Sequence, residues 1–204
     1  MEKKEKIISE ILESEWVFFQ MADNKGGRAE CQDNREEFFI MRKSQWKTFP
    51  LNILESYLED LKTAEKKRHN IVAEKYARMM EYTVPEEYEA IKNLIPEISV
   101  SKKELVNKIV DIYLNWEKEA QDKYPKIMSR GRPLYSKDDT PHSVSIETYL
   151  RGELYSYSER TLDLYYLYME SCLNKSRNLA IENIENIVFE KGFYSLEDAE
   201  EKIK

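Results

Sequence analysis

The chain has 204 residues, of which 41% are hydrophobic, 12% aromatic and 35% charged, a composition typical of a soluble globular protein and too aromatic for a disordered one. Its 32 Lys and Arg against 39 Asp and Glu give a net charge of -7, so no overall positive field draws it to nucleic acid, and we expect no nucleic-acid partner. With only 5 Gly and 6 Pro for tight turns, an all-β fold is disfavoured and long helices are expected.

The sequence indicates a cytoplasmic protein with no membrane association. Its N-terminus alternates Lys with Glu and contains no apolar run of signal-peptide or membrane-spanning length. The two cysteines, Cys31 and Cys172, are too few for a disulfide framework. Together with the two histidines they do not have the spacing of a structural zinc site, so we predict no metal ligands.

Apolar periodicity and breaker residues predict the helices of the first half. In the first of these helices Glu15 lies on the apolar stripe. Residues 23–28 break that helix, and Asp33 and Asn34 are caps for the next one. The predicted helices cover about 3–22, 35–47, 50–65 and 69–81, and a short acidic helix begins at Pro85.

A linker at residues 95–100 separates the second half. Ser101 to Glu104 have the pattern of a capping box, which starts a long helix to about residue 122. Residues 124–142 contain three prolines and are expected to form a long ordered loop. The remaining helices are predicted at about 144–156, 159–173 and 176–190, with a terminal helix capped by Ser195.

Two of these helices have apolar faces that we assign to the core. In the helix at 69–81 the assigned face consists of Val72, Tyr76, Met79 and Met80. In the helix that follows the linker it consists of Val106, Ile109, Tyr113, Trp116 and Ala120.

The two halves of the chain are alike. Asn70 aligns with Asn178, and Tyr57 with Tyr165, at a constant offset of 108 residues. Amphipathic helices of similar length always align to some extent, which is the alternative explanation. We predict an all-α fold: one helical domain over residues 1–204, a bundle of about eight to ten helices built from two pseudo-repeated four-helix halves at about 1–95 and 101–204.

Several sequence strings resemble those of a known family. They are GGRAECQD at 26–33, FIMRKSQ at 39–45, EKYARMM at 74–80, GRP at 131–133, DTP at 139–141, ETYLRGEL at 147–154 and RNL at 177–179. The chain resembles the bacterial family DUF4125, a domain of unknown function, over nearly its whole length. The resemblance implies a stand-alone bacterial protein and brings no known activity, substrate, cofactor or catalytic residue.

The candidate binding residues gather around two dipeptides, Gly27-Arg28 and Gly131-Arg132. An arginine fork suits a carboxylate or phosphate held bidentately, so the two loops could frame one anionic ligand. The alternative is that Arg42 and Arg151 form internal ion pairs with carboxylates nearby, such as Glu37 and Glu147. The candidate ligand-binding residues are Arg28, Asp33, Arg42, Gln45, Arg132, Asp139, Glu147 and Arg151.

Catalytic sites are weaker candidates. Cys31 follows a Gly-rich turn and precedes a helix, where a thiolate would be stabilised, but a plain buried cysteine explains it better; Cys172 is assigned to the core. No Glu-x-x-His motif, phosphate loop or nucleophile elbow is present. The carboxylates that could converge on a metal, or else be paired with arginines, are Glu15, Glu37, Glu74, Glu147 and Glu182.

The leading hypothesis is a cytosolic helical binding or interaction protein, whose Arg- and acid-lined pocket takes a small anionic ligand or the acidic segment of a partner protein. The first alternative is an enzyme in the same pocket, with Glu37, Glu147 or Asp139 as acid-base or metal-binding groups, or Cys31 as nucleophile. The second is a structural assembly protein. The sequence identifies no cofactor.

Overall fold

A computed structural model describes residues 2–23 and 27–203. Over these residues the fold is all-α, as predicted, with eleven α-helices, ten of them seven residues or longer, and no strand. Residues 24–26 of the predicted break lie outside the described part. The α-helices are α1 (Glu2–Gln20), α2 (Arg35–Lys47), α3 (Leu51–Lys66), α4 (Ile71–Thr83), α5 (Pro85–Ile91), α6 (Val100–Lys123), α7 (Pro125–Met128), α8 (Ile146–Tyr155), α9 (Glu159–Asn174), α10 (Leu179–Glu190) and α11 (Leu196–Lys202).

Side-chain caps fix most of the helix starts. The Asn34 side chain accepts the Glu37 amide hydrogen at the start of α2, and Ser195 accepts that of Asp198 at the start of α11, both as expected. The predicted cap Ser101 is wrong. Ser99 accepts the Lys102 amide hydrogen instead, and α6 therefore begins two residues earlier.

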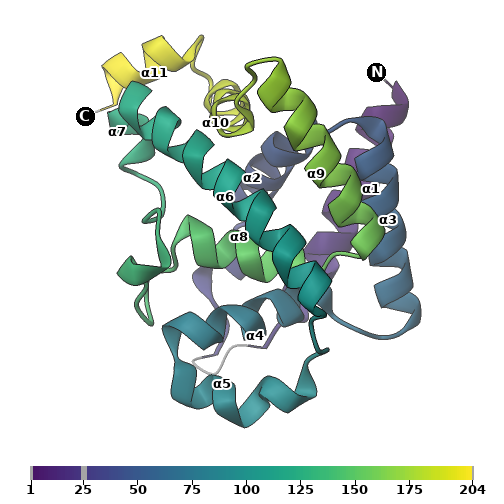
Figure 1. Cartoon of the computed structure of the whole chain (residues 1–204). Coiled ribbons are helices and arrows are strands. Elements are labelled where there is room, and N and C mark those ends of the chain that lie inside the picture. Colours follow the sequence, from purple (N-terminus) through teal and green to yellow (C-terminus); the bar gives the residue numbers. More distant parts are fainter. Residues whose placement is uncertain (1, 24–26, 204) are drawn as a thin grey trace.

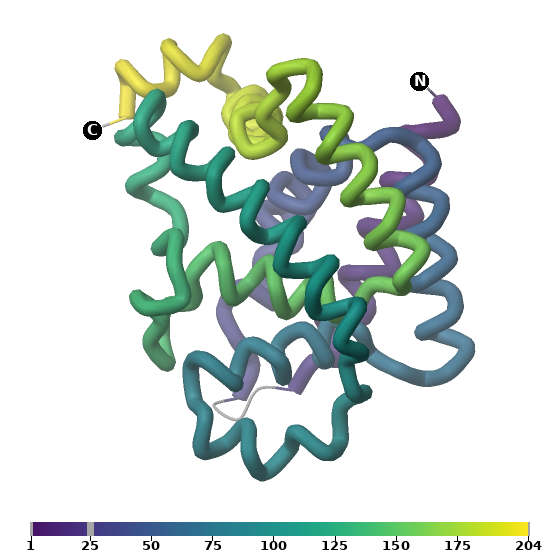
Figure 2. The backbone as a smooth tube through the Cα atoms, in the orientation of Figure 1, coloured from purple at the N-terminus to yellow at the C-terminus, as the bar shows by residue number. Residues whose placement is uncertain are grey.

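The helices of the two halves interlock (Figures 1 and 2). Helix α1 packs on α2 and α3, and α6 packs on α8, α9 and α10. Across the halves, α4 lies against α8, α10 against α2, and α3 against α9. The main hydrophobic core consequently contains buried residues of both halves, such as Trp46 and Leu162. None of the described helices combines the length and apolarity that a bilayer-spanning segment needs.

A second, smaller core lies at the C-terminal end of the chain. It joins Tyr124, Val188, Leu196 and Ala199, with partly buried side chains of α7 packed against it. The Glu200 carboxylate accepts the backbone N–H groups of Lys126 and Ile127 at the start of α7. Helices α7, α10 and α11 are thus held together beside the end of α6.

Helix α4 differs from the prediction. Of the face assigned to the core, only Met79 is fully buried, and Val72, Tyr76 and Met80 are half-buried. The buried stripe is rotated and is rich in charge, because charged side chains of α4 find partners inside the fold. It consists of Ile71, Glu74, Lys75, Arg78 and Met79. The face assigned on α6 is confirmed: Val106, Ile109, Trp116 and Ala120 are buried and Tyr113 is half-buried.

Local details recur 108 residues apart. Helices α3 and α9 each have 16 residues, and the turns after them contain Arg68 and Ser176, with φ of 53° and 54°. Asn70 caps α4 and donates its side-chain N–H to the Phe18 carbonyl, while Asn178 caps α10 and donates to the Trp116 carbonyl. Each of these two helices is therefore tied to the first helix of its own half.

Candidate functional site

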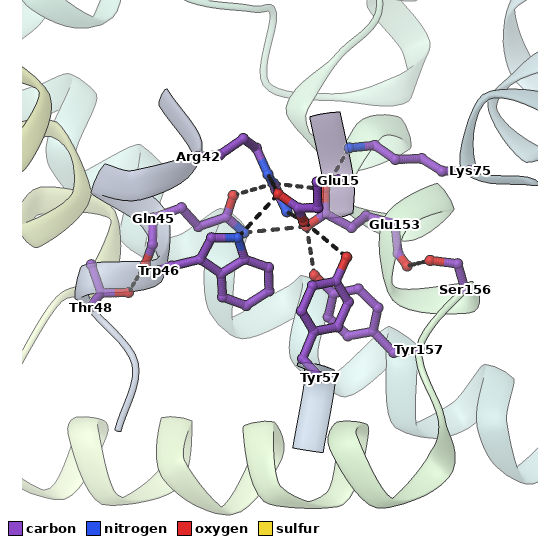
Figure 3. Close-up of polar contacts among 10 residues, drawn as sticks. All are labelled: Glu15, Arg42, Gln45, Trp46, Thr48, Tyr57, Lys75, Glu153, Ser156 and Tyr157. Atoms are coloured by element: carbon purple, nitrogen blue, oxygen red, sulfur yellow. Dashed lines mark hydrogen bonds and ion pairs between the residues drawn. The ribbon is translucent and has the colours of Figure 1, made fainter. Parts of the chain in front are cut away.

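Four charged side chains meet at the crossing of α1, α2, α4 and α8 (Figure 3). Glu15, Arg42, Lys75 and Glu153 have side chains that are 3%, 9%, 8% and 4% exposed, respectively. We call these four residues the buried charge cluster. Its two cations and two carboxylates balance.

Arg42 is the centre of this cluster. Its Nη2 donates to Glu15 Oε1 at 2.5 Å and its Nε to Glu15 Oε2 at 2.9 Å, a bidentate pair. Its Nη1 donates to Gln45 Oε1 at 2.6 Å and to Glu153 Oε1 at 3.1 Å. One guanidinium therefore joins α1, α2 and α8.

Other groups satisfy the remaining capacity of the two carboxylates. Lys75 Nζ donates to Glu153 Oε2 at 2.5 Å, and the Tyr157 hydroxyl donates to Glu153 Oε1 at 2.6 Å. The Tyr57 hydroxyl donates to Glu15 Oε1 at 2.9 Å, and the Trp46 indole N–H to Glu15 Oε2 at 3.3 Å. Buried charges are tolerated when they are paired and hydrogen-bonded in this way.

Electrostatics keep Arg42 and Glu153 ionised. Burial by itself raises the pKa of Glu153, but Arg42 and Lys75 outweigh it and hold that pKa well below its ordinary range. Burial by itself lowers the pKa of Arg42, and the two carboxylates more than offset it, so the net shift is upward. The pKa values of Tyr57 and Tyr157 are raised by burial and by the adjacent carboxylates, so both hydroxyls stay protonated donors.

A small cavity of about 30 Å³ adjoins the cluster. Besides the four charged residues, aromatic side chains line it, among them Phe38, Tyr76 and Tyr149. A volume of this size holds one or two water molecules. The cavity is too small for a metabolite.

Helix α8 links the cluster to the second Gly-Arg loop. The Tyr149 ring has Lys75 Nζ 3.4 Å and the Arg132 guanidinium carbon 4.7 Å from its centroid. Arg132 also donates from Nη1 to the Val144 carbonyl at 3.2 Å. Both cations are close enough for cation–π contact with the same ring.

The eight candidate ligand-binding residues lie in five groups with different partners. Arg42 and Gln45 are in or beside the buried charge cluster. Arg28 donates to Asp33 Oδ1 at 2.7 Å and to Gln20 Oε1 at 2.5 Å. The Arg28 guanidinium is therefore already bonded to its own loop and to the end of α1.

The other groups lie in the second loop and in α8. Asp139 accepts from the Ser145 amide and from the Thr148 hydroxyl, both at 2.5 Å, and so fixes the start of α8. Glu147 pairs with Arg151 at 3.4 Å, which is the internal ion pair that the sequence suggested as an alternative. Arg132, described above, contacts a backbone carbonyl and an aromatic ring.

The suggested partner of Arg42, Glu37, is elsewhere. Glu37 pairs with Lys191 at 2.8 Å, and Arg42 pairs with Glu15 and Glu153 instead. A spacing of about one helical turn brought Glu147 to Arg151, but the buried carboxylates of α1 and α8 are better partners for the Arg42 side chain, which is buried.

The carboxylates proposed to converge have separate partners. Glu74 contacts Arg78 and His69, and Glu182 contacts Arg177, each at 2.5 to 2.6 Å at the closest atoms. Across residues 2–23 and 27–203 no three His, Cys, Asp or Glu side chains lie close enough together to hold one metal ion. Cys172 is buried in the core as expected, whereas Cys31 is exposed rather than buried.

Sequence reasoning missed Lys75 and Glu153 as partners of Arg42. Both belong to strings that were noted only for their family resemblance. The signal that could have found them is a charged residue at a stripe position of an amphipathic helix, as Glu15 was found. Which carboxylate pairs with which cation, 27 and 111 residues apart for Arg42, is set by the fold.

Residues 123–137, which we call the basic segment, differ from the rest of this acidic chain. They include five Lys or Arg and no Asp or Glu: Lys123, Lys126, Arg130, Arg132 and Lys137. All five are exposed. Among the described residues, no ion pair involves Lys126, Arg132 or Lys137.

Comparisons with known proteins give a family without an activity. A family model described as "Protein of unknown function (DUF4125)" matches residues 5–201, which confirms the resemblance seen in the sequence strings. No curated protein and no solved structure matches significantly.

Proposed function

We propose that this chain, which belongs to the DUF4125 family, is a cytoplasmic helical binding protein. It recognises an acidic segment of a partner protein through the basic segment. The family description assigns no activity. The observation that carries the proposal is the contrast between its cations. Arg42 and Lys75 are buried and neutralised by carboxylates, whereas Lys126, Arg132 and Lys137 are exposed without an ion pair in the described chain.

An acidic segment suits this surface better than a small ligand does. The cavity of about 30 Å³ has no room for a metabolite, and the five cations are spread over fifteen residues of sequence. Complementary charge on a partner raises the association rate and favours that partner over neutral ones. Arg132 and Lys137 also lie over the rings of Tyr149 and Tyr135, which limits their freedom and the entropy lost on binding.

The finer architecture that we propose is an internal duplication, with α1 to α4 equivalent to α6 and α8 to α10. The Asn70 and Asn178 contacts support it, because their acceptors Phe18 and Trp116 are 98 residues apart while the donors are 108 apart. The difference of ten residues falls in the connection between α6 and α8. The basic segment lies in that longer connection, so it is an addition to the repeat.

The test compares two triple variants with the same change in net charge. The first, Lys126→Gln/Arg132→Gln/Lys137→Gln, removes exposed cations of the basic segment. The control, Lys3→Gln/Arg35→Gln/Lys62→Gln, removes three exposed cations that pair with Glu55, Glu13 and Glu10. The probe is a fluorescein-labelled peptide of ten glutamates, and binding is measured by fluorescence anisotropy at low and physiological salt.

We expect the intact chain to bind the peptide, more weakly at higher salt, and the first variant to lose about tenfold or more in affinity. The control should stay within about threefold. Equal losses in the two variants, or no binding by the intact chain, would contradict the proposal. If inorganic phosphate at millimolar concentration displaces the peptide from Arg132, the segment binds small anions as well.

A further inference from the structure

Glu117 of α6 is a buried carboxyl group that forms no ion pair with any residue the structure describes. The residue is 6% exposed, and its Oε2 has no hydrogen-bond partner in the described structure. The other buried carboxylates, Glu15, Glu74 and Glu153, each have a Lys or Arg partner within 2.5 Å. A buried carboxylate left without a counterion is costly, so Glu117 requires an explanation of its own.

The position of Glu117 is one that packing would fill with an apolar residue. In the internal duplication proposed above, the offset of 98 that relates Phe18 to Trp116 gives Glu117 the place of Phe19, which is 5% exposed in the core of the first half. On α10, which packs against α6, the side-chain oxygen of Asn183 is also buried without a partner. A carboxylate can only accept hydrogen bonds, whereas a neutral carboxyl also supplies an O–H donor.

Two carboxylates of the helices packed against α6 have cationic partners of their own. Glu153 of α8 is bonded to Arg42 and Lys75, and Glu182 of α10 to Arg177. Burial and Glu117 raise the pKa of Tyr113, with a smaller contribution from Tyr165 of α9, whereas Tyr165 does not shift the pKa of Glu117. Lys126 of α7 is exposed.

Two opposing effects act on the acidity of Glu117. Burial raises its pKa from 4.5 to about 7, and the hydrogen-bonding Tyr113 hydroxyl works against that rise. The carboxyl therefore changes its charge near neutral pH. It lies on the stretch of α6 between Trp116, whose carbonyl accepts from the α10 cap Asn178, and Tyr124, which packs with Val188 of α10.

Helix α10 connects this contact to the C-terminal end of the molecule. Its Val188 belongs to the second core with Tyr124, Leu196 and Ala199. Tyr124 donates its hydroxyl to Glu197 at 3.0 Å, and Glu200 holds the start of α7. A loosening of α10 would therefore reach α7 and α11.

We propose that Glu117 is a proton-sensitive latch: its neutral carboxyl keeps α10 packed on α6, and its ionisation loosens α10 together with α7 and α11. Because α7 lies within the basic segment, the latch also sets how firmly that segment is held, and this last link alone rests on the proposed function. The latch itself is tested without any binding partner.

The sign of the pH effect follows from proton linkage. Between pH 4.5 and 7 the folded chain keeps a proton on Glu117 that the unfolded chain has lost. Stability consequently falls as pH rises through this window and levels off above it. Relative to a variant that stays neutral, the folding equilibrium constant should fall by about a hundredfold.

The experiment combines urea unfolding with hydrogen exchange from pH 5 to pH 8 on the full chain. Glu117→Gln keeps the size and removes the charge, and Glu104→Gln, at an exposed position of the same helix, is the control. We expect the intact chain and Glu104→Gln to lose stability relative to Glu117→Gln as pH rises. Protection of α10 and α11, corrected for the intrinsic exchange rate, should fall above pH 7 while that of α1 and α3 persists.

Parallel pH profiles for the intact chain and Glu117→Gln would overturn the latch. A loss of protection that is uniform along the chain would also overturn it, because the opening would then be global. The exchange measurement on the intact chain decides the matter even if Glu117→Gln does not fold. A chain that shows the latch but does not bind the glutamate peptide would refute the proposed function and leave the latch standing.

Discussion

Arg42 contacts both carboxylates of the buried charge cluster, so its removal has the largest expected effect. We predict that Arg42→Met, which keeps most of the volume, lowers the free energy of unfolding by about 3–5 kcal/mol, because Glu15 loses its cation while buried. Urea unfolding measures the change. Lys62→Met, at an exposed pair with Glu10, should cost less than about 1 kcal/mol. Similar small losses in both variants would show that water reaches the cluster.

Glu153 gives the cluster a dependence on acid. Arg42 and Lys75 hold its pKa well below 4.5 in the folded chain, so its contribution to stability is present above the unfolded pKa and is lost as pH falls below about 4.5. We predict a steeper loss of stability from pH 5 to pH 3 for the intact chain than for Glu153→Gln, followed by circular dichroism in urea. Equal slopes would contradict a depressed pKa. This trend is opposite in sign to that of Glu117.

At the scale of single residues, the sequence was informative about burial and not about partners. Glu15 could be placed on an apolar stripe because the stripe is periodic and local. Its cation, Arg42, is 27 residues away, and the second carboxylate, Glu153, is 111 residues from Arg42. The pair Glu147–Arg151 was anticipated as an alternative because both residues lie on one helix.

The crossing of α4 and α8 depends on the absence of a side chain at Gly152. A Cβ atom there would lie 3.0 Å from the Lys75 carbonyl oxygen and 3.0 Å from Met79 Cγ. We predict that Gly152→Ala costs about 1–2 kcal/mol, since overpacking outweighs the gain in helix propensity. Thermal unfolding measures it, with Asp163→Ala on the exposed face of α9 as control. A more stable Gly152→Ala would mean that the two helices can move apart at no cost.

The cap of α4 performs two tasks that one substitution can separate. Asn70→Asp keeps the oxygen that accepts from Val72 and Ala73 but loses the donor to the Phe18 carbonyl. We predict a cost of about 1–2 kcal/mol in urea unfolding, because that carbonyl loses its side-chain donor. Asn34→Asp, which keeps its cap on Glu37, should be nearly neutral. If both variants are neutral, the tie between α4 and α1 contributes nothing.

At the scale of elements, most helices could be predicted to within two or three residues because caps and breakers are local signals. The exposed side of α4 was misjudged for a physical reason. Its Glu74, Lys75 and Arg78 resemble a solvated face. They are buried only because α8 and other segments of the same chain pack over them. A pattern of hydrophobic residues alone points to a neighbouring face, which shares only Met79 with the buried stripe.

At the scale of the molecule, neither half has a complete interior. Helix α4 covers α8, and α10 covers α2, so each half supplies a helix to the other. We predict that residues 1–95 expressed alone show no cooperative unfolding by circular dichroism, and that mixing them with residues 96–204 restores it. A cooperative transition for either fragment alone would show that a half is self-sufficient. The all-α class followed from composition, but this exchange did not, because nothing local encodes it.

The exchange of helices also has a consequence for the order of events during synthesis. Arg42 and Glu15 leave the ribosome early, whereas Glu153 emerges 111 residues after Arg42. At a translation rate of about 5–20 residues per second, the first half therefore waits on the order of ten seconds for α8. During that interval Lys75 has no carboxylate from α8 and the face of α4 stays open, so the nascent chain is most vulnerable to misassembly shortly before its last third appears.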